Sequence, residues 1–178
     1  GNRGHTDVLS LGTEEDGNQY LQYSNPTGGW LDVATVVQND ASRNVWSGLG
    51  KLTFHFKHDG SGNAMAIQIG TADGKYFHVD HKLAAEDGTD WKTVEVDLVD
   101  NPSLTQSWPE DANKGKTMTA DDLTLIKEVV IAGNTWNNDA PAVTFAVDDM
   151  KVMPGDGAVS TPAPEEPTEP AETPETPD

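Results

Sequence analysis

The sequence of 178 residues predicts an all-β protein, an antiparallel β-sandwich of the jelly-roll type. Two observations lead to this fold class. Apolar and polar residues alternate with a period of two over short runs, and Gly, Asn and Asp separate these runs about every ten residues. Helical periodicity is nearly absent before residue 155. This combination is typical of β-sandwiches and jelly rolls, whose strands are short and evenly spaced.

Each strand follows from the alternation, in chain order. The stretches "DVLSLG", "NQYLQYS" and "GWLDVATVVQ" predict the first three strands, and "KLTFHFK", "AMAIQIG", "GKYFHVDHK" and "WKTVEVDLVD" predict the next four. The late strands are "LIKEVVIAG" and "VTFAVDDMKVM". The predicted inward side chains are Leu52, Phe54, Phe56, Met65, Ile67, Ile69, Phe77, Val79, Val94, Val96, Leu98, Val143, Phe145 and Val147. The stretch "TADDLTLIK" predicts one helical turn, opened by Thr119 or Asp121.

Composition divides the chain into a globular module, residues 1–154, and a linker, residues 155–178. The linker has no Lys, Arg or aromatic residue, and it contains six Pro and seven acidic residues. Such a segment buries too little apolar surface to become ordered, so we expect a disordered acidic linker. Linkers of this kind are typical of modular extracellular bacterial proteins. We therefore expect a secreted, monomeric module that is covalently linked to a catalytic or anchoring module.

Charge and cysteine content exclude several classes of function. The formal net charge of -19 repels phosphate backbones and anionic lipids, so we expect neither nucleic acid nor a membrane as partner. No apolar run approaches the roughly 20 residues of a membrane-spanning helix. The absence of cysteine excludes disulfides, thiolate zinc sites and a cysteine nucleophile. An uncharged ligand or a cation fits this composition better.

Five stretches follow one another in an order that resembles a known family. They are "NQYLQYSNPTGGW", "VWSGLGKLTFHFKHDGSGNAMAIQI", "TDWKTVEVDL", "LTLIKEVVIAGN" and "VTFAVDDMKV". Over residues 7–153 the chain resembles the jelly-roll carbohydrate-binding modules of family 11 and related families. The resemblance implies a noncatalytic module of a bacterial plant-cell-wall hydrolase. It also implies binding of β-glucan chains, such as xyloglucan, mixed-linkage glucan or amorphous cellulose, along a cleft on one sheet.

Two tryptophans in polar loops are the first candidates for sugar binding. A sugar ring has apolar faces and equatorial hydroxyls, so its binder needs flat aromatic rings together with amide and imidazole groups. Trp136 lies beside Asn134, and Trp108 lies close to Gln106. We expect both rings to stack on pyranose faces while these amides bind hydroxyls. Alternatively, each ring folds back and caps the end of the sandwich.

The other three tryptophans are assigned from their neighbours. Trp30 follows "TGG", where glycines leave open space, and both packing and ligand contact stay open for it. Trp46 and Trp91 stand directly before regular strands, so we expect them to pack.

The floor of the predicted cleft consists of outward strand positions. Ala64 and Ala66 are small enough to leave a groove, and Gln68, Tyr76 and His78 come into register if their strands pair. The alternative is an ordinary solvated sheet face, which needs no ligand to explain it.

Calcium is the expected cofactor, with a structural role, and the resemblance to family 11 and its relatives supplies much of the reason. Calcium takes oxygen ligands from loops and strand ends. Glu14 and Asp16 in the first loop can meet Asp148 in the last strand if these segments are neighbours. A run of solvated acids is the alternative. Zinc is disfavoured, because His78 and His81 are three apart and face opposite sides of a strand.

Two other function classes stay open beside sugar binding. One is a small β-sandwich hydrolase or lyase, because glycoside hydrolysis requires only two suitably spaced carboxylates. Thirty acidic residues give such pairs by chance, however, and no GxSxG, HExxH or P-loop pattern is present. The other is a structural or protein-binding domain of a secreted complex, whose exposed aromatic rings contact a partner.

Overall fold

A computed structural model describes residues 8–26, 31–37, 46–61, 64–82, 89–133 and 142–155, with the backbone alone for 31–37, 64, 81, 82 and 132. The predicted linker lies outside the described residues from position 156 onward. The strands described are β1 (Leu9–Thr13), β2 (Gln19–Asn25), β3 (Leu31–Val37), β4 (Lys51–His58), β5 (Ala64–Thr71), β6 (Tyr76–Lys82), β7 (Lys92–Asp97), β8 (Thr105–Trp108), β9 (Ile126–Gly133) and β10 (Val143–Met153). A 3-10 turn, η3 (Asp122–Leu125), precedes β9.

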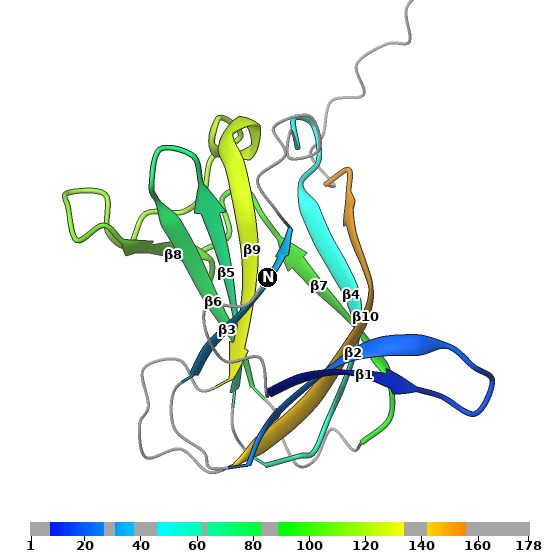
Figure 1. Ribbon diagram of the computed structural model, residues 1–178. Helices are drawn as coiled ribbons and strands as arrows, with labels where there is room; N and C mark the ends of the chain where they lie inside the picture. Colours follow the sequence, from blue (N-terminus) through cyan, green and yellow to red (C-terminus); the bar gives the residue numbers. More distant parts are fainter. Residues whose placement is uncertain are drawn as a thin grey trace, which may run out of the picture.

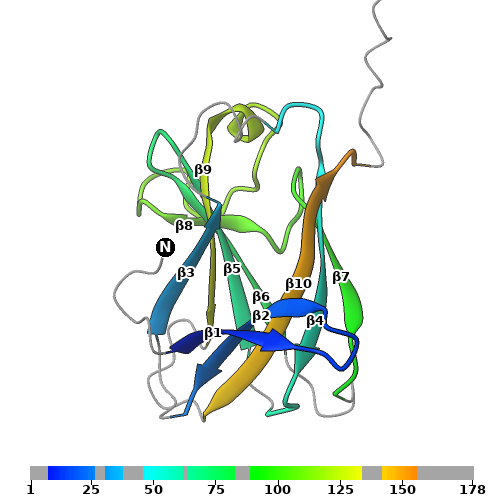
Figure 2. The same ribbon diagram turned by 45° about the vertical axis from the view of Figure 1, so that its right-hand side comes forward.

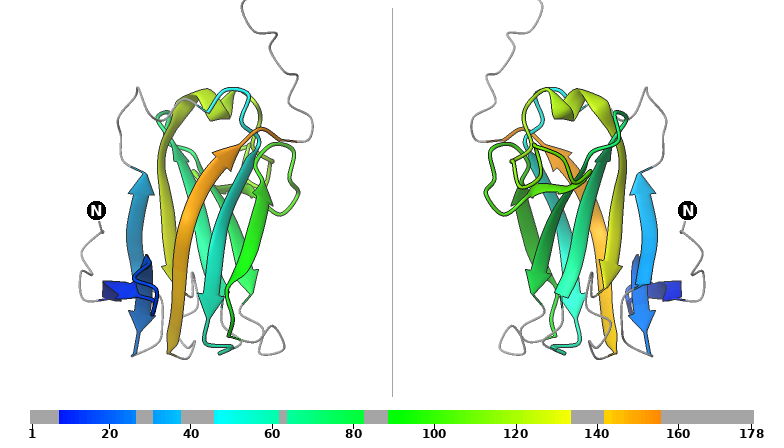
Figure 3. Two further views of the ribbon diagram at one scale, coloured as in Figure 1. Left: turned by 90° about the vertical axis from the view of Figure 1, so that its right-hand side faces the viewer. Right: turned by 90° about the vertical axis from the view of Figure 1, so that its left-hand side faces the viewer.

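The strands form two antiparallel sheets that face each other. The first sheet has the order β1-β2-β10-β4-β7, and the second has the order β3-β9-β5-β6-β8. Figure 1 shows the second sheet on the left and the first on the right, and Figures 2 and 3 show the same two layers from other sides. The predicted all-β sandwich is therefore confirmed.

The core lies between the sheets and consists of the inward positions of the alternation. All of the predicted inward side chains are buried except Val79, which is half-buried against the core. Tyr23 and Phe145 stack with ring centroids 4.6 Å apart and planes 7° apart. Phe56 packs against Phe145 at 5.7 Å. Trp46, which was expected to pack, is 5% exposed and belongs to this core.

Strands from opposite ends of the sequence pair in the first sheet. β10 pairs with β2, with Phe145 opposite Tyr23, and also with β4, with Phe145 opposite His58. The register of β10 and β4 shifts between Asp148 and Lys151, where Asp149 adopts a φ of 52°. The first hairpin is thus held beside the last strand, as a jelly roll requires.

The chain after β8 folds back along the free edge of the second sheet. The Gln106 amide donates to the Lys116 carbonyl at 2.8 Å, and the Gly115 amide donates to the Gln106 carbonyl at 2.9 Å. Thr105 forms an isolated bridge with Thr117. This loop then leads to η3, which confirms the single helical turn that "TADDLTLIK" predicts. No helix among the described residues is long and apolar enough to cross a membrane.

Candidate binding site

Strand pairing brings three of the predicted site residues, Gln68, Tyr76 and His78, onto the outer face of the second sheet. Gln68 lies opposite His78, and Tyr76 lies opposite Gly70 on β5. Tyr76 is also paired with Trp108 on β8, but the register of β6 and β8 shifts at this point. Residues directly opposite each other in a sheet project to the same side. The predicted register of Gln68, Tyr76 and His78 is therefore confirmed. We call this surface the Tyr76 face. It consists of Gln68, Tyr76, His78, Asp80 and Glu128, together with Trp108 at its β8 edge.

The Tyr76 ring lies flat against the sheet because Gly70 leaves room for it. A Cβ atom at Gly70 would lie 2.8 Å from Cε1 of Tyr76 and 2.9 Å from Cγ of Glu128, so a side chain there would displace the ring. The Tyr76 hydroxyl donates to Oε1 of Glu128 at 2.5 Å. The ring therefore spans from β6 across β5 to β9, and the hydrogen bond fixes its orientation.

His78 lies in a chain of hydrogen bonds beside this ring. Its Nε2 is 2.9 Å from Oδ1 of Asp80, and its Nδ1 is 3.4 Å from Nε2 of Gln68. When His78 donates from Nε2 to Asp80, Nδ1 accepts from the Gln68 amide. The imidazole is thus oriented, and its side chain stays 14% exposed.

Trp108 is the large exposed ring of this face, with 58% of its surface accessible. It ends β8 at the edge of the sheet, next to the loop that projects at the left of Figure 1. Gln106, predicted to bind ligand, is only 3% exposed, because its Nε2 donates to the Pro109 carbonyl at 3.2 Å and to Oδ1 of Asp111 at 3.1 Å. That prediction is corrected: Gln106 holds the loop beside Trp108.

The remaining predicted residues divide into two groups. Trp136, Asn134 and Trp30 lie outside the described residues, so their roles stay predictions. Ala66, predicted to floor a groove, is fully buried, and this part of the face is closed. The open part of the Tyr76 face is therefore its β6–β8 edge. Trp91 is half-buried and lies on the first sheet's side of the molecule.

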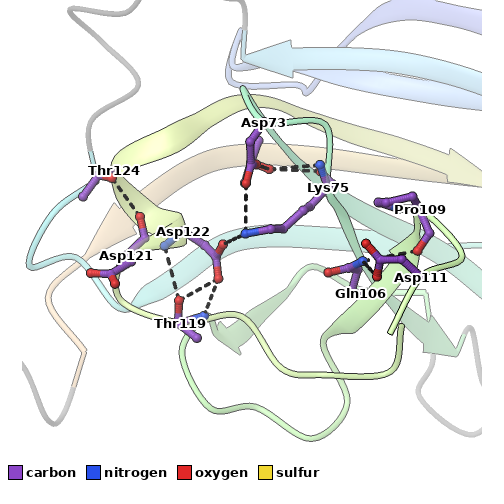
Figure 4. A network of polar contacts seen from close by, with 10 residues as sticks. Asp73, Lys75, Gln106, Pro109, Asp111, Thr119, Asp121, Asp122 and Thr124 are labelled. Carbon is purple, nitrogen blue, oxygen red and sulfur yellow. Dashed lines mark hydrogen bonds and ion pairs between the residues drawn. The ribbon is translucent and has the colours of Figure 1, made fainter. Parts of the chain in front are cut away.

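A charged network fixes the turn that leads into Tyr76, as Figure 4 shows. Nζ of Lys75 is 2.8 Å from Oδ1 of Asp122 and 3.0 Å from Oδ2 of Asp73. Asp122 also accepts from the amide and hydroxyl of Thr119, at 2.9 and 2.7 Å. The turn before β6 is thereby joined to η3. Because Lys75 immediately precedes Tyr76, the network positions the start of β6.

The ionisation of this network is shifted in the direction that stabilises its charges. Burial alone would raise the pKa of Asp122, but hydrogen bonds from Lys75 and Thr119 outweigh it and lower this pKa. Burial of Asp73 is likewise outweighed, by Thr71 and Lys75, so its pKa is lowered. Hydrogen bonds to Asp122 and Asp73 raise the pKa of Lys75.

Asp122→Asn is expected to lower the free energy of unfolding by about 2 kcal/mol, because a charge-assisted hydrogen bond to Lys75 is lost. For a domain of this size that corresponds to a melting temperature about 4–8 °C lower. Thermal unfolding followed by circular dichroism measures the change. Asp121→Asn is the matched control, because Asp121 is an exposed neighbour whose side chain makes no capping hydrogen bond.

The loss of stability caused by Asp122→Asn should become smaller both at low pH and at high pH. The lowered pKa of Asp122 stabilises the fold above the ordinary carboxyl value of 3.8, and this contribution is lost as the pH falls through the lowered pKa. The raised pKa of Lys75 likewise stabilises the fold below the ordinary lysine value of 10.5. This stabilisation is lost as the pH rises through the raised pKa. The variant should therefore differ most from wild type between these limits, and a constant difference across pH would contradict the ion pair.

The acids predicted to bind calcium gather around Asn18 but do not form a ligand set. Oδ1 of Asp16 accepts from the Asn18 amide at 2.9 Å, and Oδ2 of Asp148 accepts from its side chain at 2.8 Å. Oε1 of Glu14 accepts from the indole of Trp91 at 2.8 Å. Among the described residues no group of three or more acidic or histidine side chains is arranged to hold a metal ion. These three residues do not fit the ion as predicted, and calcium stays a prediction.

The Tyr76 face can bind an uncharged, hydroxylated ring. Trp108 and Tyr76 offer apolar surface at small entropic cost, since each ring has only two side-chain torsions. Gln68 offers amide groups beside these rings, whereas both ring nitrogens of His78 are already engaged, by Asp80 and by Gln68 itself. The carboxylates of Glu128 and Asp80 are already hydrogen-bonded and serve to orient Tyr76 and His78.

Glu128, Asp80 and the Lys75–Asp122 pair were not predicted from the sequence as parts of the site. The sequence does indicate that Glu128 has a partner, because an acid within the apolar run "LIKEVVIAG" is costly to bury without one. Nothing in the sequence identifies Tyr76 as that partner, because the two residues are 52 positions apart.

Known proteins resemble this chain in sequence and in fold. A mannan endo-1,4-beta-mannosidase of Bifidobacterium adolescentis is 49% identical over 169 residues, which cover 93% of this chain but 16% of that protein. The family 11 carbohydrate-binding module of a cellulosomal cellulase of Clostridium thermocellum superposes with a TM-score of 0.54 at 15% identity, covering 83% of this chain and 81% of that one. The family 30 module of a second cellulosomal cellulase of that organism gives 0.51 at 18% identity, covering 87% of each chain. These two likenesses concern the fold alone.

Family membership rests on a match over nearly the whole folded part. The family model described as "Carbohydrate binding domain (family 11)" matches residues 1–151. The mannanase relative extends far beyond the matched segment, since this chain spans about one sixth of its length. The chain therefore belongs to carbohydrate-binding family 11, and it is a noncatalytic glycan-binding β-sandwich.

Proposed function

We propose that the module binds uncharged β-linked polysaccharide chains on the Tyr76 face. Trp108 and Tyr76 stack on pyranose rings, and Gln68, which His78 orients, hydrogen-bonds to their hydroxyls. The observation that carries this proposal is that Tyr76, whose ring is fixed by Glu128, is paired with Trp108, which is 58% exposed at the adjoining edge of the sheet. A chain of sugars that crosses β6 toward β8 meets both rings.

β-Glucans are the first ligand class, and mannans are the second. Xyloglucan, mixed-linkage glucan and amorphous cellulose are neutral, and their rings offer apolar faces that suit stacking on indole and phenol rings. The net charge of -19 disfavours polyanionic chains such as polygalacturonate. Mannan is favoured by one specific observation, because the relative with 49% identity is named a mannan endo-1,4-beta-mannosidase.

A noncatalytic module of this kind acts by keeping the protein attached to it close to a polysaccharide. We propose that the chain is part of a secreted bacterial plant-cell-wall hydrolase. This is supported by the mannan endo-1,4-beta-mannosidase relative, of which the chain covers only 16%. Weak binding to a polymer holds the attached enzyme close to its substrate and raises the effective concentration of reacting chains.

Affinity electrophoresis tests the proposal. Native gels contain xyloglucan, barley β-glucan, glucomannan, linear mannan, xylan or polygalacturonate, and we expect retardation by the neutral glucans or mannans alone. The dissociation constant should lie between about 1 μM and 1 mM. A few stacked rings give a binding free energy of this size once the entropic cost of ordering the polysaccharide and the side chains is subtracted. The same mixtures should release no reducing sugar. Release of reducing sugar would indicate an enzyme, and absence of retardation in every gel would favour a protein-binding domain.

A further inference from the structure

The first hairpin bends over the outer face of the first sheet, on the opposite side of the molecule from the Tyr76 face. β2 pairs with β10 only as far as Leu21, so Tyr20 lies where the hairpin leaves the sheet. Three strand spacings separate β2 from β7, or roughly 14 Å. The rings of Tyr20 and Trp91, which directly precedes β7, are nevertheless 5.3 Å apart. Figures 1 and 2 show the hairpin running across the direction of β10 and β4.

Tyr20 and Trp91 form a rigid aromatic corner. Their planes meet at 75°, so one ring stands upright against the other. Gly12 lies opposite Tyr20 in the hairpin, and a Cβ atom at Gly12 would collide with the Tyr20 ring. The indole nitrogen of Trp91 donates to Oε1 of Glu14 at 2.8 Å. Both rings are therefore held in place from β1 and its loop.

A hollow of about 240 Å³ opens beside the Tyr20 ring, against which Trp91 packs. Its lining includes Tyr20, Gln22, Lys57, Thr144 and Ala146. Ala146 is opposite both Gln22 and Lys57 in the sheet, so its methyl group forms part of the floor and leaves depth. Pockets for drug-sized ligands measure about 300–1,000 Å³, so this hollow suits a single small ring.

The polar groups of the hollow match a neutral sugar. Gln22 can donate and accept, and Thr144 offers a hydroxyl, 3.1 Å from that of Ser24. Nζ of Lys57 is 3.4 Å from Oε1 of Glu14 and 5.6 Å from the Trp91 ring centroid. The Lys57 charge is thus balanced by Glu14, and it does not call for an acidic ligand.

We propose that this hollow is a second sugar site, which takes one neutral hexopyranose unit, a chain end or a side branch. The proposal rests on the carbohydrate-binding role of the family but not on the Tyr76 face. A single unit on this side and a chain on the other would let the module contact two polysaccharide chains, because the two surfaces lie on the outer faces of opposite sheets.

Nuclear magnetic resonance of the indole N–H groups tests the second site. Trp91 and Trp108 report separately on the two surfaces once Trp→Phe variants have assigned their signals. Titration with the methyl glycosides of glucose, mannose and galactose, up to about 100 mM, covers a dissociation constant of about 10 mM. We expect the Trp91 signal to shift with saturation for at least one of them, and to do so equally in Trp108→Ala.

Two variants of the hollow and one control complete the test. Gly12→Ala displaces Tyr20, and Ala146→Leu fills the floor, so each should weaken the Trp91 response at least tenfold. If Gly12→Ala does not fold, the result for Ala146→Leu alone tests the second site. Leu11→Ala is the control on the same hairpin, since Leu11 is 71% exposed and should change nothing. A Trp91 signal that shifts with none of the three sugars, or shifts as strongly in folded Ala146→Leu, overturns the second site. If polysaccharides still retard the protein when the second site is overturned, the proposed binding on the Tyr76 face is unaffected.

Discussion

Trp108→Ala is expected to weaken polysaccharide binding by about 2 kcal/mol, or roughly 30-fold, because the loss of one stacked indole removes both buried apolar area and ring stacking. The melting temperature should stay within about 2 °C of wild type, since 58% of the Trp108 surface is already exposed. Affinity electrophoresis over a series of polysaccharide concentrations gives the ratio of dissociation constants, and circular dichroism gives the melting temperature.

Met153→Ala is the matched control for Trp108→Ala. Met153 is a large apolar side chain, 46% exposed, at the end of β10 in the other sheet. Its removal should leave the retardation unchanged. If Trp108→Ala is retarded as strongly as wild type on every responding polysaccharide, Trp108 is not part of the site and the Tyr76 face loses its exposed ring.

Phe145→Ala is expected to lower the free energy of unfolding by about 3–5 kcal/mol, the usual cost of removing a fully buried aromatic ring. Phe145 is 2% exposed, stacks on Tyr23 and packs against Phe56, so its loss leaves a cavity between the sheets. Urea denaturation should show a lower midpoint with an unchanged m-value. The melting temperature should fall by about 6–20 °C.

Phe145→Leu is the companion variant, because it keeps most of the buried volume. It should cost about 1–1.5 kcal/mol, since volume-conserving apolar replacements are tolerated best. A Phe145→Ala variant that loses less than about 1 kcal/mol would contradict the packing of this ring in the core.

The strands and the core were predictable because a two-residue period needs only local sequence. Phe54, Phe56, Ile67, Ile69 and Phe145 alternate with polar or small neighbours, and each is buried in the structure. The register of Gln68 with His78 was predictable for the same reason, since β5 and β6 are joined by a short turn. Ala66 shows the limit of this reasoning. Its outward position was right, but periodicity does not tell which part of an outer face is covered.

The orientation of the site residues was not predictable, because it depends on strands that are distant in sequence. Tyr76 is fixed by Glu128, and Lys75 is held by Asp122, 47 positions away. Only the pairing of β5 with β9 brings these groups together. Gln106 was wrongly assigned to ligand binding, because its hydrogen bonds to Pro109 and Asp111 require a loop that doubles back on its own strand.

The segment that runs back along β8 has a consequence for the behaviour of the molecule at high concentration. A bare sheet border with a hydrophobic ring beside it recruits strands from other copies and begins aggregation. Here the peptide groups of Gln106 are already satisfied by Gly115 and Lys116. Trp108 can therefore stay exposed to solvent without turning this edge of the sheet into a template for fibrils.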